Sequence, residues 1–111
     1  MPRTRSSDYR IQEVLRSLEN HPAKTVEELA GLVSLSGSRL GHLFKAEVGV
    51  SLDSFLTKVR VDKGAQLLEG THMQVKEIAA IVGYRQAPSF DRAFRNKFKL
   101  SPADYRRLKR M

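Results

Sequence analysis

The feature that most constrains the fold of this chain is an internal repeat. The residue pattern of positions 26–33 returns 49 positions later over 75–82, and the pattern of positions 40–50 returns 50 positions later over 90–100. The matched pairs are Val26 and Val75, Glu28 and Glu77, Leu29 and Ile78, Ala30 and Ala79, Leu32 and Ile81, Val33 and Val82, Leu40 and Phe90, Phe44 and Phe94, Val48 and Phe98, and Val50 and Leu100. The offset grows by one only in the intervening turn, where changes in length are well tolerated. The chain is therefore predicted to contain the same helix-turn-helix unit twice.

Helical spacing runs through the whole chain. Apolar residues at i, i+3, i+4 and i+7 predict an amphipathic helix over about residues 8–20. A capping box in residues 25–28 predicts the start of the next helix. The longest helix is predicted to run from Ser51 to about Leu68 and to join the two units, with Gly64 as its weak point. No stretch has the alternation or the turn signals of a β-hairpin, so the predicted fold is all-α.

The basic residues are concentrated at the C-terminal end. The chain has 20 Lys plus Arg against 12 Asp plus Glu, a net charge of +8. From Arg85 onwards there are nine basic and two acidic residues, a net charge of +7, which leaves +1 for residues 1–84. Such an excess favours a polyanionic partner, because basic side chains that neutralise phosphates release condensed counterions. The alternative is a charged face that only keeps the protein in solution.

Several classes of function lack the residues they need. Without cysteine there are no disulfides, thiolate metal sites or cysteine nucleophiles. His21, His42 and His72 do not have the spacing of metal ligands, and there is no catalytic triad or glycine-rich phosphate loop, so we predict neither an enzyme nor a bound metal or cofactor. No small-molecule site is expected within the chain. No apolar run is long enough to span a bilayer, so a cytoplasmic protein without a membrane partner is predicted.

The outward face of the second helix in each unit marks it as a possible reader of DNA. Turning Leu40, Leu43 and Phe44 inward leaves polar or very small residues facing outward. In the first unit these are Ser38, Arg39, Gly41, His42 and Lys45. In the second unit the outward residues are Pro88, Arg92 and Arg95, with Ser89 and Asp91 at the edges.

Side-chain chemistry suggests a role for each of these residues. The planar guanidinium of arginine can donate two hydrogen bonds to guanine, whereas lysine acts as a point charge suited to phosphate. We therefore predict that Arg92 reads a base and that Lys45 contacts phosphate, while Arg95 could do either. Alternatively, the two arginines only solvate an exposed helix. His42 could bond to a base edge or be an ordinary surface histidine.

Pro88 stands near the start of the second reader helix. Proline is tolerated in the first turn of a helix, where backbone N–H groups have no intrahelical acceptor, so the helix is predicted to start near Gln86. At an outward position its ring could touch a thymine methyl group but cannot form a hydrogen bond with a base. Hydrogen bonds to base edges are therefore expected to come from Gln86 and Arg92 instead.

The sequence resembles the DNA-binding domain of AraC/XylS-family transcription regulators over nearly its whole length. The resemblance rests on residues 26–56, on Arg60 with the GAQLL of 64–68, and most specifically on residues 75–107. In the last block the residues that match the family motif are Ile78, Ala79, Gly83, Tyr84, Phe90, Arg92, Phe94, Arg95, Ser101, Pro102, Tyr105 and Arg106.

The resemblance implies a seven-helix, all-α domain with two helix-turn-helix subdomains joined by a long linker helix. They would bind adjacent major-groove segments of double-stranded DNA and regulate transcription, typically as an activator that contacts RNA polymerase. The implied base-reading residues are Ser38, Arg39, Gly41, His42, Gln86, Ala87, Pro88, Ser89 and Arg92, and the expected phosphate contacts are Lys45, Arg95 and Lys97. Gly41, Ala87 and Pro88 depart from the family pattern, since none of them has a polar side chain.

The expected organisation is a disordered stub over residues 1–7 and one DNA-binding domain over 8–111. Within that domain we expect a first subdomain over 8–49, a linker helix over 51–69 and a second subdomain over 72–111. Most members of the family also carry a ligand-sensing or dimerising domain, so the chain is expected to be either the C-terminal domain of a longer regulator or a small stand-alone one. The alternatives to a specific regulator are a nonspecific basic nucleic-acid binder and a helical protein-interaction module.

Overall fold

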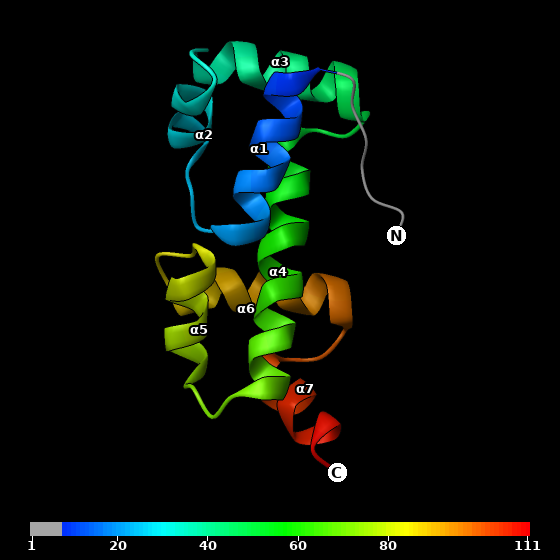
Figure 1. The fold of residues 1–111 in the computed structure, drawn as a ribbon. Helices are drawn as coiled ribbons and strands as arrows, with labels where there is room; N and C mark the ends of the chain where they lie inside the picture. Colours follow the sequence, from blue (N-terminus) through cyan, green and yellow to red (C-terminus); the bar gives the residue numbers. More distant parts are fainter. Residues whose placement is uncertain (1–7) are drawn as a thin grey trace. The chain divides into compact units, whose positions relative to one another are not determined.

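The structure, a computed structural model, describes residues 8–111, so the stub predicted over residues 1–7 lies outside it. Over the described residues the chain forms seven α-helices and no strand, which confirms the all-α prediction (Figure 1). The helices are α1 (Tyr9–Asn20), α2 (Val26–Leu32), α3 (Gly37–Val48), α4 (Leu52–Gly70), α5 (Val75–Val82), α6 (Ala87–Phe98) and α7 (Pro102–Lys109).

The helices belong to two compact units, and the boundary between the units falls between Leu56 and Thr57. That boundary lies inside α4, the helix that was predicted to join the units. The first five residues of α4 therefore belong to the first unit and the remainder to the second. The linker helix is a component of both units rather than a spacer outside them.

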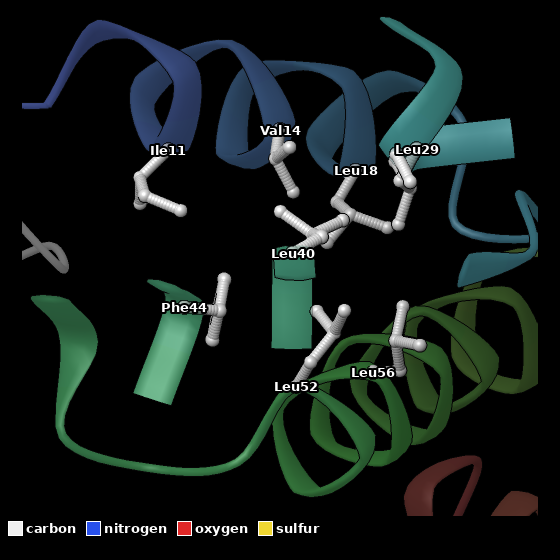
Figure 2. Close-up of a cluster of buried hydrophobic side chains, with 9 residues drawn as sticks. Ile11, Val14, Leu18, Leu29, Leu40, Phe44, Leu52 and Leu56 are labelled. Atoms are coloured by element: carbon white, nitrogen blue, oxygen red, sulfur yellow. The ribbon is translucent and has the colours of Figure 1, made fainter. Parts of the chain in front are cut away.

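The first unit is held together by a core of aliphatic side chains around Phe44. Helix α1 packs against α2 and α3, and the first part of α4 completes the core. Figure 2 shows Leu40 of α3 directed towards the side chains of α1. The buried residues of this core are Ile11, Val14, Leu18, Leu29, Ala30, Leu40, Phe44, Leu52 and Leu56.

The core of the second unit is richer in aromatic rings. Phe90 and Phe94 of α6 are fully buried, and the ring of Tyr105 on α7 lies edge-on to that of Phe94 at a centroid distance of 5.2 Å. The buried residues of this core are Val61, Ala65, Leu68, Ile78, Ala79, Val82, Phe90, Phe94 and Tyr105.

Side-chain caps set the helix starts that the sequence predicts. Thr25 N–H donates to the carboxylate of Glu28 at 2.8 Å, and Glu28 N–H donates to the Thr25 hydroxyl oxygen at 3.1 Å, so the predicted capping box is confirmed. The hydroxyl oxygens of Ser51 and Ser101 each accept from the backbone N–H three residues later, at 3.2 and 3.1 Å. These hydrogen bonds begin α4 and α7 at equivalent places of the repeat.

The repeat extends further towards the N-terminus than the helix-turn-helix unit predicted from the sequence. The buried residues Ile11 and Leu18 of α1 correspond, 50 positions on, to the buried residues Val61 and Leu68 of α4. At the other end, the start of α4 corresponds to α7. The repeated unit therefore has four helices, and α4 supplies the last helix of the first copy and the first helix of the second.

Gly64 was predicted to be the weak point of α4, and the structure corrects that interpretation. The residue is buried in the second core, where it faces the ring of Phe90. Its lack of a side chain makes room for this ring, so the glycine is part of the packing.

Arg106 of α7 and Arg110, the residue that caps the C-terminal end of α7, hold the C-terminal end of α4. The Nε atom of Arg106 donates to the carbonyl oxygen of Leu68 at 3.0 Å, and one of its terminal nitrogens donates to that of Thr71 at 3.2 Å. Arg110 donates to the same two carbonyl oxygens, at 3.3 Å for Leu68. Carbonyl groups at the end of a helix lack intrahelical donors, so these guanidinium groups satisfy them.

Candidate nucleic-acid interface

The two helix-turn-helix turns share one backbone design. Ser34 lies two residues after the end of α2, and Gly83 directly follows the end of α5. Both residues have positive φ angles, of 60° and 114°. The next residue, Leu35 or Tyr84, donates its N–H to the carbonyl oxygen of the alanine five residues earlier, at 3.0 and 2.8 Å. The turn from α2 to α3 and the turn from α5 to α6 therefore have the same backbone conformation at their start.

Helices α3 and α6, the second helices of the two helix-turn-helix motifs, begin differently. Ser36 caps α3, because its hydroxyl oxygen accepts a hydrogen bond from Arg39 N–H at 3.1 Å. Gln86 is the N-cap of α6, and its side chain makes no capping hydrogen bond to the first turn. Pro88 is the second residue of α6, which confirms the prediction that it sits in the first turn of a helix starting near Gln86.

The outward face predicted for α3 is the face that the structure exposes. Leu40 and Phe44 are fully buried, and Leu43 is partly buried against the core. Of the predicted contact residues on α3, Ser38, Arg39, His42 and Lys45 are exposed and Gly41 is partly exposed. These residues lie on one helix surface, at the spacing i, i+4 and i+7 for Ser38, His42 and Lys45.

The face predicted for α6 is likewise turned away from the core of its own unit. Phe90 and Phe94 are fully buried at the positions that match Leu40 and Phe44. Of the predicted contact residues in this region, Gln86, Pro88, Ser89, Arg92, Arg95 and Lys97 are exposed and Ala87 is partly exposed. The structure therefore brings Pro88, Arg92 and Arg95 together on the outward face of α6, whereas Lys97 lies on another side of the helix, where it pairs with Asp62 of α4.

Some basic residues of α6 are paired within the second unit. Nε of Arg95 lies 2.7 Å from a carboxylate oxygen of Asp91. Lys97 forms an ion pair with Asp62 of α4, which also pairs with Lys58 at 3.1 Å. Partial burial acts to raise the pKa of Asp62, but the hydrogen bonds from the two lysines outweigh it and hold the pKa below its usual range. Lys97 must share or release this carboxylate in order to bind a phosphate.

Other cations on these faces have no such partner. Within residues 8–111, the side chains of Arg39, Lys45 and Arg92 form no hydrogen bond or ion pair. Their charge is therefore available to an external anion, which suits the roles predicted for Lys45 and Arg92. Arg85, in the turn before α6, has the same properties but is absent from the predicted set of contact residues.

The C-terminal excess of positive charge serves the fold as well as the surface. Of the nine basic residues from Arg85 onwards, seven interact with other parts of the described chain. These are Arg95 with Asp91, Lys97 with Asp62, Lys99 with the Asn96 carbonyl oxygen, Arg106 and Arg110 with the end of α4, Arg107 with Asp104, and Lys109 with the ring of Tyr105. Arg85 and Arg92 remain without a partner among the described residues. The prediction that the basic excess attracts a polyanionic partner therefore applies most directly to these two residues.

No group of three or more His, Asp or Glu side chains within residues 8–111 is arranged to hold a metal ion. In the same residues, no helix is both long and apolar enough to cross a membrane.

The sequence and the fold of this chain are similar to those of known proteins. Residues 29–108 match the family model of a helix-turn-helix domain. The fold is similar to the C-terminal domain of AraT, a response regulator from Geobacillus stearothermophilus, with a TM-score of 0.81, 32% identity and coverage of 91% of this chain and 86% of that one. It is also similar to the DNA-binding domain of AdpA, a global transcriptional factor, in complex with a target DNA. That match has a TM-score of 0.80 and 30% identity, and it covers 94% of this chain and 95% of the AdpA chain. The chain belongs to the AraC/XylS family.

Among full-length relatives of this AraC-type domain is the transcriptional activator RhaS of Klebsiella pneumoniae. The two are 33% identical over 103 residues, which are 91% of this chain and 37% of RhaS. The chain spans about a third of the length of the curated relatives that it matches first. Those relatives therefore extend well beyond the DNA-binding region compared here.

Proposed function

We propose that this AraC-type domain regulates transcription by binding specific sites on double-stranded DNA, with α3 and α6 as the two recognition helices. The observation that carries the proposal is the match between their exposed faces. Ser38, His42 and Lys45 on α3 occupy the same positions as Pro88, Arg92 and Arg95 on α6, while the apolar residues of both helices are buried. In helix-turn-helix proteins this second helix lies in the major groove.

Base reading by α6 is assigned mainly to Arg92. Its guanidinium is exposed, has no partner within the described chain and lies one helical turn after Pro88. Arginine can donate to O6 and N7 of one guanine, a contact that discriminates by about 1–3 kcal/mol against a wrong base. Gln86, Ala87, Pro88 and Ser89 are proposed to contact the neighbouring bases, with the ring of Pro88 suited to a thymine methyl group.

Base reading by α3 is assigned to the residues of its first half. Ser38, Arg39 and His42 carry polar side chains that reach outward from the helix. Gly41 contributes no side chain, so it would only allow a close approach of the backbone to the DNA. The first unit is therefore proposed to read its half-site through hydrogen bonds from shorter side chains and from Arg39.

Phosphate contacts are proposed for Lys45, Arg95 and Lys97, at or beyond the middle of the recognition helices. Lys45 has no partner within the described chain, so its ammonium group can pair with phosphate directly. Arg95 and Lys97 already pair with Asp91 and Asp62. Their contribution to DNA affinity is therefore expected to be smaller than that of Lys45.

A larger regulatory protein is the proposed setting for this domain. RhaS is described as an activator, and the chain corresponds to about a third of its length. We propose that the domain likewise serves as the DNA-binding part of a transcription regulator, and that activation proceeds through contact with RNA polymerase. The remaining part of such a regulator would carry any response to a ligand.

Selection of binding sites from random DNA by the purified chain tests the proposal. Two recognition helices in successive major grooves predict an enriched motif with two half-sites one helical turn, about 34 Å, apart. A single half-site would assign the other unit to backbone clamping. Binding without any enriched sequence would favour a nonspecific nucleic-acid binder, and no binding at low salt would favour a protein-interaction module.

A further inference from the structure

Arg85 is an extra residue of the second helix-turn-helix turn. The left-handed residue and the residue after it match between the units at an offset of 49, as Ser34 with Gly83 and Leu35 with Tyr84. The N-cap residues of α3 and α6, Ser36 and Gln86, match at an offset of 50. The one residue left over between the matched positions is therefore Arg85, which has no counterpart in the first unit.

The residues on both sides of Arg85 are fixed by the fold. Tyr84 is partly buried against the second core, with its ring centroid 5.7 Å from that of Phe90, and its N–H is bonded to α5. Burial raises the pKa of the Tyr84 hydroxyl. On the other side, Gln86 is the N-cap of α6. Arg85 therefore sits at a defined place between a core residue and the start of the recognition helix.

The Arg85 side chain is exposed and has no hydrogen-bond or ion-pair partner among the described residues. The first turn of α6 contains no acidic residue that could neutralise it. Its positive charge is therefore placed at the end of α6 that carries Gln86, Ala87 and Pro88. In helix-turn-helix proteins the N-terminal residues of the recognition helix contact base edges, and phosphates line the groove that the helix enters.

We propose that Arg85 binds a DNA phosphate at the edge of the major groove entered by α6. The inference rests on the proposed function, since it requires α6 to lie in the groove. The inference gives the second unit a contact with the DNA backbone from its turn. The first unit has no equivalent of this contact, because Leu35 and Ser36 are adjacent in the chain with no residue between them. The second half-site is then held by one more phosphate contact than the duplicated design alone provides.

The test measures the affinity of Arg85→Gln for the selected site and for a random-sequence duplex over a series of salt concentrations. Loss of one phosphate contact should reduce the slope of log affinity against log salt by about 0.9, equivalent to about eightfold weaker binding at 0.1 M salt. Both duplexes should show the same loss, because phosphate carries no sequence information. Arg85→Lys, which keeps the charge, should restore most of the affinity and the slope.

Arg107→Gln is the matched control. It removes one positive charge from an exposed residue of α7 that pairs with Asp104 and has no proposed DNA contact. Arg85→Gln must lower affinity and slope well beyond this control. An effect equal to that of Arg107→Gln would overturn the phosphate contact, and so would a changed base preference, which would make Arg85 a base reader.

The random duplex separates this inference from the proposed function. If the chain shows no sequence preference but Arg85→Gln still reduces the salt slope, specific regulation fails and the phosphate contact stands. If the chain has an enriched site but Arg85→Gln behaves like the control, the contact fails and the proposed function stands. Absence of any DNA binding at low salt would overturn both.

Discussion

Gly64 of α4 and Phe90 of α6 are in such close contact that no side chain fits between them. A Cβ atom on Gly64 would lie 2.6 Å from both Cε1 and Cζ of the Phe90 ring. The equivalent pair in the first unit is Val14 and Leu40, both fully buried. A smaller residue on one helix thus accompanies a larger residue on the other. The two copies of the repeat fill the same position of their cores with the volume divided differently.

Gly64→Ala is expected to destabilise the protein. Helix propensity alone favours alanine by about 1 kcal/mol, but overpacking against the buried ring costs about 1–3 kcal/mol and should outweigh it. Urea unfolding followed by circular dichroism measures the difference. Gly31→Ala is the control, because a Cβ at this position of α2 meets no atom within 4 Å and should stabilise the protein. Gly64→Ala as stabilising as Gly31→Ala would contradict the packing argument.

The double variant Gly64→Val with Phe90→Leu places the first unit's pair into the second unit. It should recover much of the stability that Gly64→Val loses alone, because Phe90→Leu removes the ring that the valine would meet and the total number of side-chain carbon atoms returns to that of the original pair. The coupling between the two sites is read from a double-mutant cycle of unfolding free energies. Additive effects would show that the residues do not compensate for each other.

Arg106→Met is expected to lower the free energy of unfolding by about 1–3 kcal/mol, because it removes two hydrogen bonds from a charged donor and leaves Arg110 as the remaining side-chain donor to the Leu68 and Thr71 carbonyl oxygens. Methionine retains the apolar stem of the side chain. Arg107→Met, on the exposed side of α7, should have little effect on stability. Chemical unfolding of both variants provides the comparison, and equal losses would show that the contacts of Arg106 with the end of α4 contribute nothing.

Tyr105 gives the stability of the protein a dependence on alkaline pH. Burial, together with the hydrogen bond that its hydroxyl donates to Glu69 at 2.5 Å, raises the pKa of Tyr105 to about 12, from an ordinary value of 10. The neutral form is favoured in the folded state, so this contribution to stability is complete below pH 10 and is lost as the pH rises towards 12. Unfolding of Tyr105→Phe between pH 9 and 12 should show a shallower decline than that of the unmutated chain. Parallel declines would rule out this linkage.

Arg92→Ala should relax the base preference at one position of the second half-site and cost about 1–3 kcal/mol of specific binding. The reason is the loss of a bidentate contact with guanine. Repeating the site selection with the variant, and measuring its affinity for the original site and for random DNA, gives the result. An equal loss on both duplexes would make Arg92 a phosphate contact.

Lys45→Ala should weaken binding to all DNA sequences similarly and should reduce the salt slope by about one. Lysine at this exposed position of α3 offers a single charge to phosphate rather than a pattern of donors to a base. Affinity measured at several salt concentrations on specific and random duplexes tests the assignment. A change in the selected sequence would identify Lys45 as a base reader instead.

Much of the architecture could be predicted from the sequence, because local signals there agree with the tertiary packing. The burial of Leu40, Phe44, Phe90 and Phe94 follows from helical periodicity, and the capping box and the serine caps set the helix starts. Pro88 was placed correctly in the first turn of α6, because proline lacks a backbone N–H and is tolerated where such groups have no intrahelical acceptor. These features depend on residues a few positions apart.

Features that depend on distant residues were missed. The reason for Gly64 lies 26 residues away in Phe90, and periodicity within α4 carries no information about that ring. The pairing of Lys97 with Asp62 and of Arg106 with the end of α4 likewise needs three-dimensional proximity, so the basic excess looked freer than it is. Arg85 did leave a signal, the change of offset in the turn, but recognising it as the inserted residue needed the hydrogen bonds on each side.

The sharing of α4 restricts how this protein can be taken apart. The boundary between Leu56 and Thr57 lies within a helix, so no loop exists at which a protease or a protein engineer could separate the two readers. A severed first half would end in unsatisfied carbonyl groups, and a severed second half would begin with unsatisfied N–H groups and without its serine cap. Transplanting either reader into another regulator would therefore require carrying a segment of its neighbour along with it.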